Sequence, residues 1–99
     1  MTDYPIPAMD DVELVEVLRA VADPIRLHIV GVLADGEAHP KTVDDWGVDV
    51  TKSTMSHHFK ILRESGLTRT LVEGRTHCIQ LRRVELDEKF PGLVDALTR

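Results

Sequence analysis

The stretch 51–67, which reads TKSTMSHHFKILRESGL, constrains the fold of this chain more than any other part of it. A helix over about 53–63 would place Met55, Phe59 and Leu62 on one side, because they recur at i, i+4 and i+7. We therefore predict an amphipathic helix whose apolar stripe faces a core.

The other side of this predicted helix carries the polar side chains of Ser53, Ser56, His57 and Lys60. These are two hydroxyls, an imidazole and a cation, with no carboxylate among them. Such groups hydrogen-bond base edges and phosphates in a major groove. The sequence predicts a DNA recognition helix here, and the alternative is an ordinary solvated face of an amphipathic helix.

A β-hairpin is predicted directly after this helix, over about 67–81. A Ser-Gly pair supplies the helix end, since glycine adopts the left-handed conformation without a Cβ clash. Two short apolar runs then flank a glycine-containing turn at 72–75, which is typical of a hairpin. We expect Arg69, Arg75 and His77 on or near its tip.

A first helix is predicted to begin at Asp10 or Asp11, both good N-cap residues, and to run to about Ala22. Its apolar side chains cover more than one face. The main stripe would be Leu14, Leu18 and Val21, broadened by Val12, Val15 and Val17. So wide an apolar surface on a short chain suggests one contact with the core and one with another subunit.

A second helix is predicted from the pair Asp23-Pro24 onward. The aspartate would cap the helix, and the proline would take its first position, where no hydrogen bond is lost by its missing N–H. The inner stripe of this helix would consist of Ile25, Ile29, Val32 and Leu33. Gly36 would end it.

Weaker patterns describe the rest of the chain. Residues 1–9 contain two prolines and predict an extended arm. Over 39–47 we expect a short helix containing Val43 and Trp46, with the tryptophan as a core anchor. Near the C-terminus a proline disfavours helix at the residue before it, so the terminal helix is predicted over about 91–98.

Length and composition set limits on the class of protein. With 99 residues and 42% hydrophobic content, the chain is expected to form one domain over 10–99. The apolar runs fall short of the roughly 18 residues that a membrane span needs, and the N-terminus lacks a signal-peptide pattern, so we expect a cytoplasmic protein. The one cysteine, Cys78, excludes an intramolecular disulfide and favours packing within a strand.

The charges are unevenly distributed along the chain, whose formal net charge is −5. Residues 1–50 carry eleven acidic and three basic side chains, whereas residues 51–83 carry seven basic and two acidic ones. An evenly spread negative charge would repel DNA. This asymmetry instead predicts one anion-binding face and an acidic back.

Three helices followed by a basic hairpin predict a mainly α fold with a small β-hairpin (α+β), the winged helix-turn-helix. Three segments also resemble one known family, in the same order and at the same spacing. They are VADPIRL at 21–27, STMSHHFKILR at 53–63 and EGR at 73–75. They are similar to ALADPTRL, STVSHHLKxLR and the start of the wing return in the ArsR/SmtB family of bacterial regulators, and the resemblance covers about 12–83.

This resemblance implies a homodimer held by the first and last helices, with both recognition helices presented to an inverted repeat in double-stranded DNA. It also implies a repressor that leaves its operator when an inducer, here unknown, weakens the complex. The residues that would contact DNA by position are Lys52, Ser53, Ser56, His57, Lys60 and Arg75.

The common metal sites of that family are absent from the sequence. The stretch 42–47, where a Cys-x-Cys pair would lie, has no thiol, and the terminal helix has no histidine and only Asp95. We therefore predict no metal ligands and no cofactor. A site formed across a dimer from Cys78, His39 or His28 stays open as an alternative.

Two other classes of function are alternatives. A catalytic role would need a nucleophile with a base, but Ser56 and His57 are adjacent on a helix and diverge, so we predict no catalytic residues and no enzyme. A protein-interaction module on the same scaffold is the remaining alternative. It would be expected to lack the cations that this segment retains.

Overall fold

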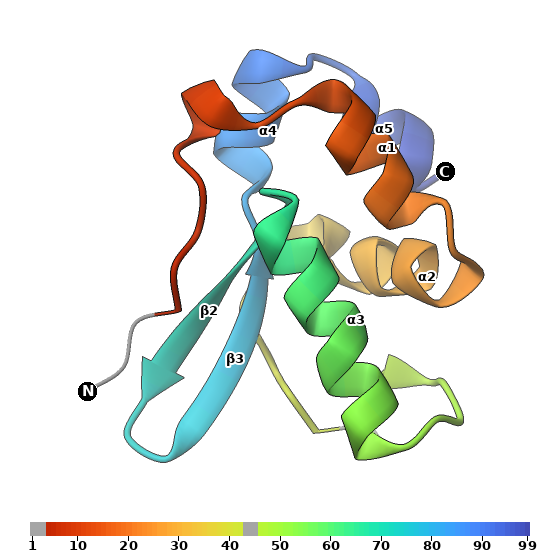
Figure 1. Cartoon of the computed structure of the whole chain (residues 1–99), viewed down its shortest axis with the longest axis vertical. Coiled ribbons are helices and arrows are strands. Elements are labelled where there is room, and N and C mark those ends of the chain that lie inside the picture. The colour runs from red at the N-terminus through yellow and green to blue at the C-terminus, as the bar shows by residue number, and fades with distance from the viewer. Residues whose placement is uncertain (1–3, 43–45) are drawn as a thin grey trace.

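The computed structural model describes residues 4–42 and 46–99, and it forms helices packed on a small antiparallel sheet (Figure 1). The helices are α1 (Leu14–Val21), α2 (Pro24–Val32), α3 (Lys52–Glu64), α4 (Arg83–Lys89) and α5 (Leu93–Leu97). The strands are β1 (His39–Pro40), β2 (Thr68–Glu73) and β3 (Thr76–Leu81), and the 3-10 turns are η1 (Met9–Asp11) and η2 (Leu33–Asp35). This architecture confirms the predicted α+β winged-helix class.

Helix α1 begins later than the sequence predicts. Asp10 and Asp11 lie in η1, and Glu13 occupies the N-cap position without a side-chain hydrogen bond, so the capping role predicted for the two aspartates is wrong. The reason is Val12, which is extended and buried between the turn and the helix. Burial of this side chain requires a non-helical residue there, which separates η1 from α1.

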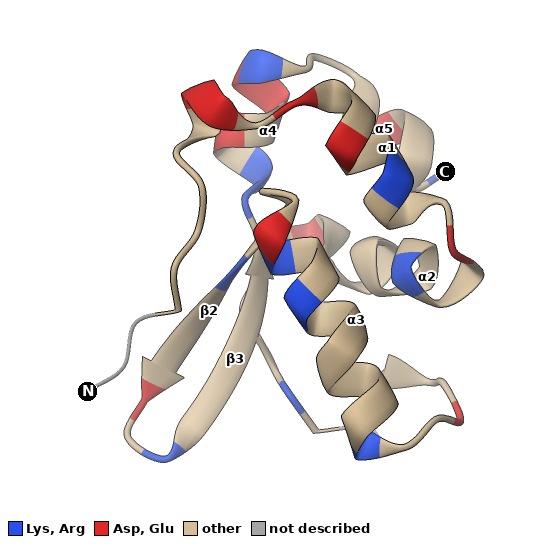
Figure 2. Cartoon of the chain, in the orientation of Figure 1, with Lys and Arg blue, Asp and Glu red and all other residues tan. Residues whose placement is uncertain are grey.

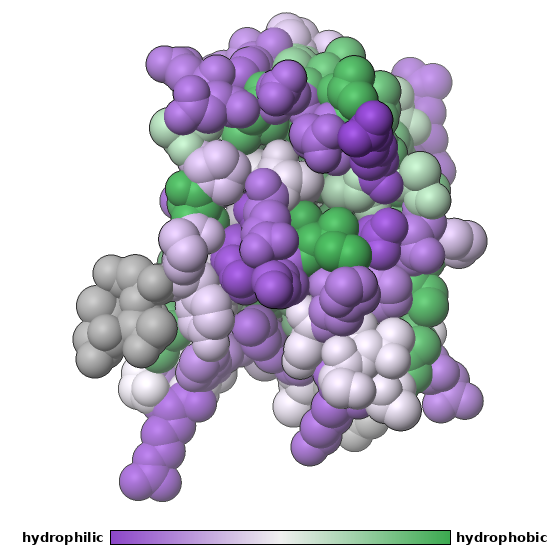
Figure 3. All heavy atoms as spheres, in the orientation of Figure 1, coloured by the Kyte–Doolittle hydropathy of each residue, from purple (hydrophilic) through white to green (hydrophobic). Residues whose placement is uncertain are grey.

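The two sides of α1 also differ from the prediction. Its core-facing residues are Val17, Ala20 and Val21. Leu14, Val15 and Leu18 instead have exposed fractions of 43%, 57% and 43%. Figure 3 shows apolar surface over α1 at the upper right. The predicted stripe of Leu14, Leu18 and Val21 is therefore divided, because Val21 packs in the core while the two leucines form an uncovered apolar surface.

Helix α2 begins as predicted. The Asp23 carboxylate accepts hydrogen bonds from the backbone N–H groups of Ile25 and Arg26, at 3.0 Å each, and Pro24 occupies the first turn. Of the predicted stripe, Ile29 and Leu33 are fully buried and Ile25 and Val32 partly so.

The Asp23 cap gives a pH-dependent prediction. The Arg26 N–H, and then the Arg26 charge and the Ile25 N–H, hold the pKa of Asp23 below its usual value. A depressed folded-state pKa means that the cap stabilises above the unfolded-state pKa and is lost as pH falls through the folded-state value. Asp23→Ala should therefore cost about 1 kcal/mol near neutral pH and less near pH 3, measured by urea denaturation.

Asp23→Ser is the matched control for this cap. Serine keeps a cap acceptor but does not titrate, so its effect on the free energy of unfolding should be smaller and nearly independent of pH. Equal losses for Asp23→Ala at both pH values would contradict the electrostatic account of the cap.

The segment predicted as a short helix over 39–47 differs where it is described. His39 and Pro40 form β1, which pairs antiparallel with Ile79 and Cys78 of β3, so a helix from residue 39 is wrong. This pairing satisfies the backbone groups along one edge of β3. Val43 lies outside the described residues. The prediction for the tryptophan is confirmed, because Trp46 is buried and its ring meets Phe59 edge-on at 5.2 Å between centroids.

The hairpin is confirmed at the predicted place. Strands β2 and β3 pair in register from Thr68–Leu81 to Glu73–Thr76, and the sheet order is β1-β3-β2. The turn contains Gly74 at φ +62°, a conformation that glycine adopts readily. Cys78 is buried on β3, as predicted for a packing residue.

The C-terminal region contains one helix that was predicted and one that was not. Helix α5 lies within the predicted range 91–98 but covers only Leu93–Leu97, while α4 was not predicted as a helix. Leu86 of α4 and Val94 of α5 are both fully buried. Helix α5 therefore packs much of its apolar surface against the core of its own chain.

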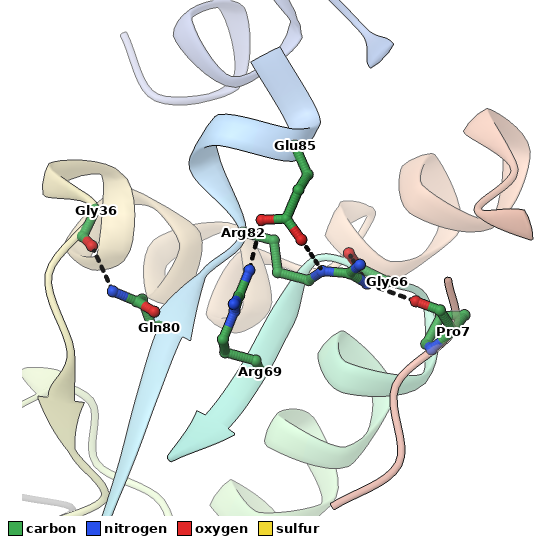
Figure 4. Close-up of polar contacts among 7 residues, drawn as sticks. All are labelled: Pro7, Gly36, Gly66, Arg69, Gln80, Arg82 and Glu85. Carbon is green, nitrogen blue, oxygen red and sulfur yellow. Dashed lines mark hydrogen bonds and ion pairs between the residues drawn. The ribbon is translucent and has the colours of Figure 1, made fainter. Parts of the chain in front are cut away.

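Arg82 joins three parts of the chain (Figure 4). Its guanidinium, 4% exposed, donates to the Pro7 carbonyl oxygen at 2.8 Å and to the Glu85 carboxylate at 3.2 Å. Arg69 donates to the same carboxylate. Arg69 thus lies at the base of the hairpin, close to α4, and its predicted position near the tip is wrong.

Candidate nucleic-acid interface

The helix predicted over about 53–63 is α3, which runs from Lys52 to Glu64. The Thr51 hydroxyl caps it by accepting a hydrogen bond from the Thr54 N–H at 3.2 Å. Met55, Phe59 and Leu62 are buried in the core, which confirms the predicted apolar stripe. The core therefore fixes which side of α3 is left facing outward.

The outward side of α3 carries the side chains that the sequence singled out. All five of these residues are exposed: Lys52, Ser53, Ser56, His57 and Lys60. They recur at intervals of three and four residues and so form one continuous helix face. No acidic residue interrupts this face before Glu64, at the end of the helix.

The two adjacent histidines of α3 have different surroundings. His57 is exposed, whereas His58 is buried and its Nδ1 lies 3.2 Å from Nη1 of Arg26. A guanidinium can only donate, so His58 Nδ1 accepts this hydrogen bond. The contact joins α2 to α3, which makes His58 a packing residue and leaves His57 for the outward face.

The hairpin places Arg75 at its exposed turn, at the same end of the molecule as the start of α3 (Figure 2). Of the basic residues in 51–83, Arg69, Arg82 and Arg83 pair with carboxylates. Among the described residues, the following make no ion pair: Lys52, Lys60, Arg63 and Arg75. The uncompensated positive charge of this segment is therefore confined to α3 and the wing, and Figure 2 shows acidic residues gathered around η1, α1 and α4.

Sequence reasoning missed Lys41 as part of this surface. Its backbone N–H donates to the His77 carbonyl oxygen at 2.9 Å, which extends the pairing of β1 with β3. Its side chain is half-buried, and burial, together with the nearby charge of Arg63, lowers the pKa of Lys41. The residue lies in the acidic half of the sequence, so only the pairing of β1 could have revealed its position.

Within one chain, the two histidines of the alternative metal site have other partners and its cysteine is buried. His28 Nε2 lies 2.7 Å from the Trp46 carbonyl oxygen, His39 pairs with Asp35 at 3.0 Å, and Cys78 is buried. Over 4–42 and 46–99, no group of three or more histidine, cysteine or acidic side chains is arranged to hold a metal ion. Within the same ranges, no helix has the length and apolar character to cross a membrane.

A polar outward helix seated on a sheet and followed at once by a basic hairpin defines a winged helix-turn-helix protein. No protein-family model matches the sequence. The chain is 33% identical over 95 residues to the uncharacterized HTH-type transcriptional regulator YceK of Bacillus subtilis, covering 89% of each protein.

Two relatives have more specific names. The arsenical resistance operon repressor of Staphylococcus xylosus is 33% identical over 75 residues, covering 76% of this chain and 71% of the relative. The biofilm growth-associated repressor of Agrobacterium fabrum is 29% identical over 97 residues, covering 96% and 79%. The chain belongs to the ArsR/SmtB family of transcriptional regulators, which confirms the resemblance noted in its motifs.

Proposed function

We propose that this protein is a transcriptional repressor, not an enzyme, that acts in the cytoplasm by binding an inverted-repeat operator as a homodimer. The observation that carries the proposal is the outward face of α3, which combines hydroxyls, an imidazole and cations with no carboxylate and lies beside the exposed Arg75 of the wing. Relatives named as repressors support the same assignment.

In this proposal α3 enters the major groove. Ser53, Ser56 and His57 would meet base edges, and Lys52 and Lys60 would meet phosphates. Arg75 at the hairpin turn would reach the sugar-phosphate backbone or the minor groove beside the recognition helix. The acidic surface around α1 and α4 would face away from DNA, which reconciles a net charge of −5 with DNA binding.

The homodimer rests mainly on α1. Its Leu14, Val15 and Leu18 are exposed, and a second copy of the same surface would cover them. Helix α5 can contribute less than the sequence suggested, because Val94 is fully buried and Leu97 is partly packed on the same core. A two-fold dimer would present its two α3 helices to half-sites about 34 Å apart.

The test separates phosphate contacts from base contacts. Lys60→Ala should weaken binding to all DNA sequences and make the dependence of log Kd on log salt shallower by about one unit. Ser56→Ala and His57→Ala should chiefly change the preference between sequences, by roughly 1–3 kcal/mol for each well-formed base contact that the substitution removes. Fluorescence anisotropy with the DNA upstream of the gene, at two salt concentrations, measures both effects.

Glu64→Ala is a matched control for these variants. Glu64 is exposed at the far end of the same helix, is not among the proposed contact residues and carries a negative charge, so operator affinity should not fall when it is replaced. If Lys60→Ala, Ser56→Ala and His57→Ala all bind the operator like the unmodified protein, α3 is not the recognition helix.

A further inference from the structure

A pocket of about 420 Å³ opens between α3, the end of β1 and the tip of the hairpin. Its lining includes the apolar side chains of Met55 and Phe59 and the basic side chains of Lys41, Lys52, Arg75 and His77. None of the lining residues in 4–42 and 46–99 is acidic. Its volume lies within the range of roughly 300–1,000 Å³ that is typical of small-molecule sites. Figure 3 shows this end of the molecule hollowed between two projecting hydrophilic side chains.

Within the described part of the chain, the positive charges around the pocket have no ion-pair partner. Lys41, Lys52 and Arg75 form no ion pair with any residue in 4–42 or 46–99. Lys41 is also half-buried and lies near Arg63. Its positive charge is therefore disfavoured both by burial and by repulsion from the Arg63 guanidinium. An anion within the pocket would offset both the burial and the repulsion.

Tyr4 holds two of the basic residues in position. Its hydroxyl lies 3.2 Å from His77 Nδ1, and the Lys41 Nζ lies 4.8 Å from the centroid of its ring. Arg63 packs on the same ring, with its guanidinium carbon 5.0 Å from the centroid. Because Lys41 also bonds His77 through the backbone, the basic side of the pocket is built before any ligand arrives.

We propose that this pocket binds a small organic anion with a flat apolar body, an aromatic carboxylate or aryl phosphate, and that this anion acts as an inducer. The anionic group would meet the basic rim, and the ring would lie on Met55 and Phe59. The regulatory part rests on the proposed function. Lys52, Ser56 and Arg75 line the pocket and also belong to the proposed DNA-binding surface, so ligand and operator compete for them.

Binding is tested first without DNA. Benzoate and phenyl phosphate are titrated into the ¹⁵N-labelled protein at constant ionic strength, with benzyl alcohol as the uncharged match and inorganic phosphate as the match without a ring. Both aromatic anions should shift the amide signals of residues around the pocket, and these shifts should reach saturation. Their affinity should be at least about tenfold higher than that of benzyl alcohol or inorganic phosphate. Failure of both aromatic anions to saturate by about 20 mM overturns the proposal. Equal affinity for inorganic phosphate and phenyl phosphate would also overturn the proposal. The ring would then add nothing to binding, and the pocket would be a binding site for a DNA phosphate only.

Two lysine variants locate the site. Lys41→Met keeps an apolar stem of similar length but removes the charge, and it should weaken benzoate binding at least about fivefold. Lys60→Met removes an exposed charge from α3 outside the pocket, and benzoate affinity should be unchanged. Equal benzoate affinity in Lys41→Met and the unmodified protein would exclude this pocket as the binding site.

The regulatory step is measured separately. Benzoate should raise the apparent Kd for the operator at fixed ionic strength, and this effect should be reduced in Lys41→Met. Operator binding that benzoate leaves unchanged, in a protein shown to bind benzoate, overturns the role as inducer. If the protein binds benzoate but no DNA, the proposed function is contradicted and the proposed binding site is supported. If the protein binds the operator but neither aromatic anion, the proposed function is supported and the proposed binding site is contradicted.

Discussion

Gly66→Ala is expected to lower the free energy of unfolding by roughly 2–4 kcal/mol, the largest stability effect that we predict for a single methyl group. Gly66 ends α3 at φ +95°, where any other residue is strained. An added Cβ would lie 2.3 Å from Cγ2 of Val12. Val12 is buried between η1 and α1 and has little freedom to move away. Urea denaturation measures the loss.

Gly74→Ala is the matched control, because Gly74 also has a positive φ, +62°, but an added Cβ would meet nothing within 4 Å. Its cost should be limited to backbone strain, roughly 1–2 kcal/mol. Gly66→Ala should therefore lower the free energy of unfolding by more than Gly74→Ala does. This additional loss should become smaller when Gly66→Ala is combined with Val12→Ala in a double-mutant cycle. Equal costs at the two glycines would mean that the close approach of Val12 does not determine the stability of this junction.

Leu14→Gln combined with Leu18→Gln is expected to convert the protein to a monomer and to lower operator affinity at least about 100-fold. Glutamine is a good helix former and adds no charge, so neither α1 nor electrostatic attraction to DNA should change. Because both leucines are exposed within one chain, the monomer should remain folded. Sedimentation velocity, circular dichroism and operator titration measure these three properties.

Ile6→Gln makes the same kind of change at an exposed apolar residue of the arm, away from α1, and should leave the oligomeric state and operator affinity unaltered. A double leucine variant that still sediments as a dimer would exclude the α1 surface as the essential contact. A double variant that is monomeric but binds its operator normally would instead contradict the dimeric mode of DNA binding.

The elements that the sequence predicted well are those whose determinants lie close together in the chain. The buried stripe of α3 depends on residues within two helical turns, and the hairpin depends on a glycine turn between its own strands. The Asp23 cap is equally local. For such elements, periodicity and turn chemistry already contain most of the necessary information.

The elements that were missed depend on partners far along the chain. Strand β1 exists because His39 and Pro40 pair with β3, about forty residues later. The start of α1 is displaced because Val12 packs against Gly66, a contact between distant segments. The pattern of apolar residues alone gives no sign of either contact, so it favoured a helix in both places.

The same distinction between local and long-range contacts applies to the residues of the candidate site. Exposure of the five polar residues on α3 followed from the buried stripe and was predictable. The pairing of Arg69 with Glu85 removed a cation from the expected hairpin tip, and the pairing of β1 added Lys41 to the surface. Counting charges along the sequence located the basic region but could not show which cations were already neutralised.

The contacts of the arm make the two ends of this protein unequal for laboratory use. Tyr4 packs on Lys41 and Arg63, and Pro7 is bonded by Arg82, so an affinity tag fused ahead of Tyr4 would lie next to the proposed DNA surface. Arg99 is exposed at the opposite end of the molecule (Figure 1). A C-terminal tag is therefore the better choice for DNA titrations, and an N-terminal tag should be cleaved before them.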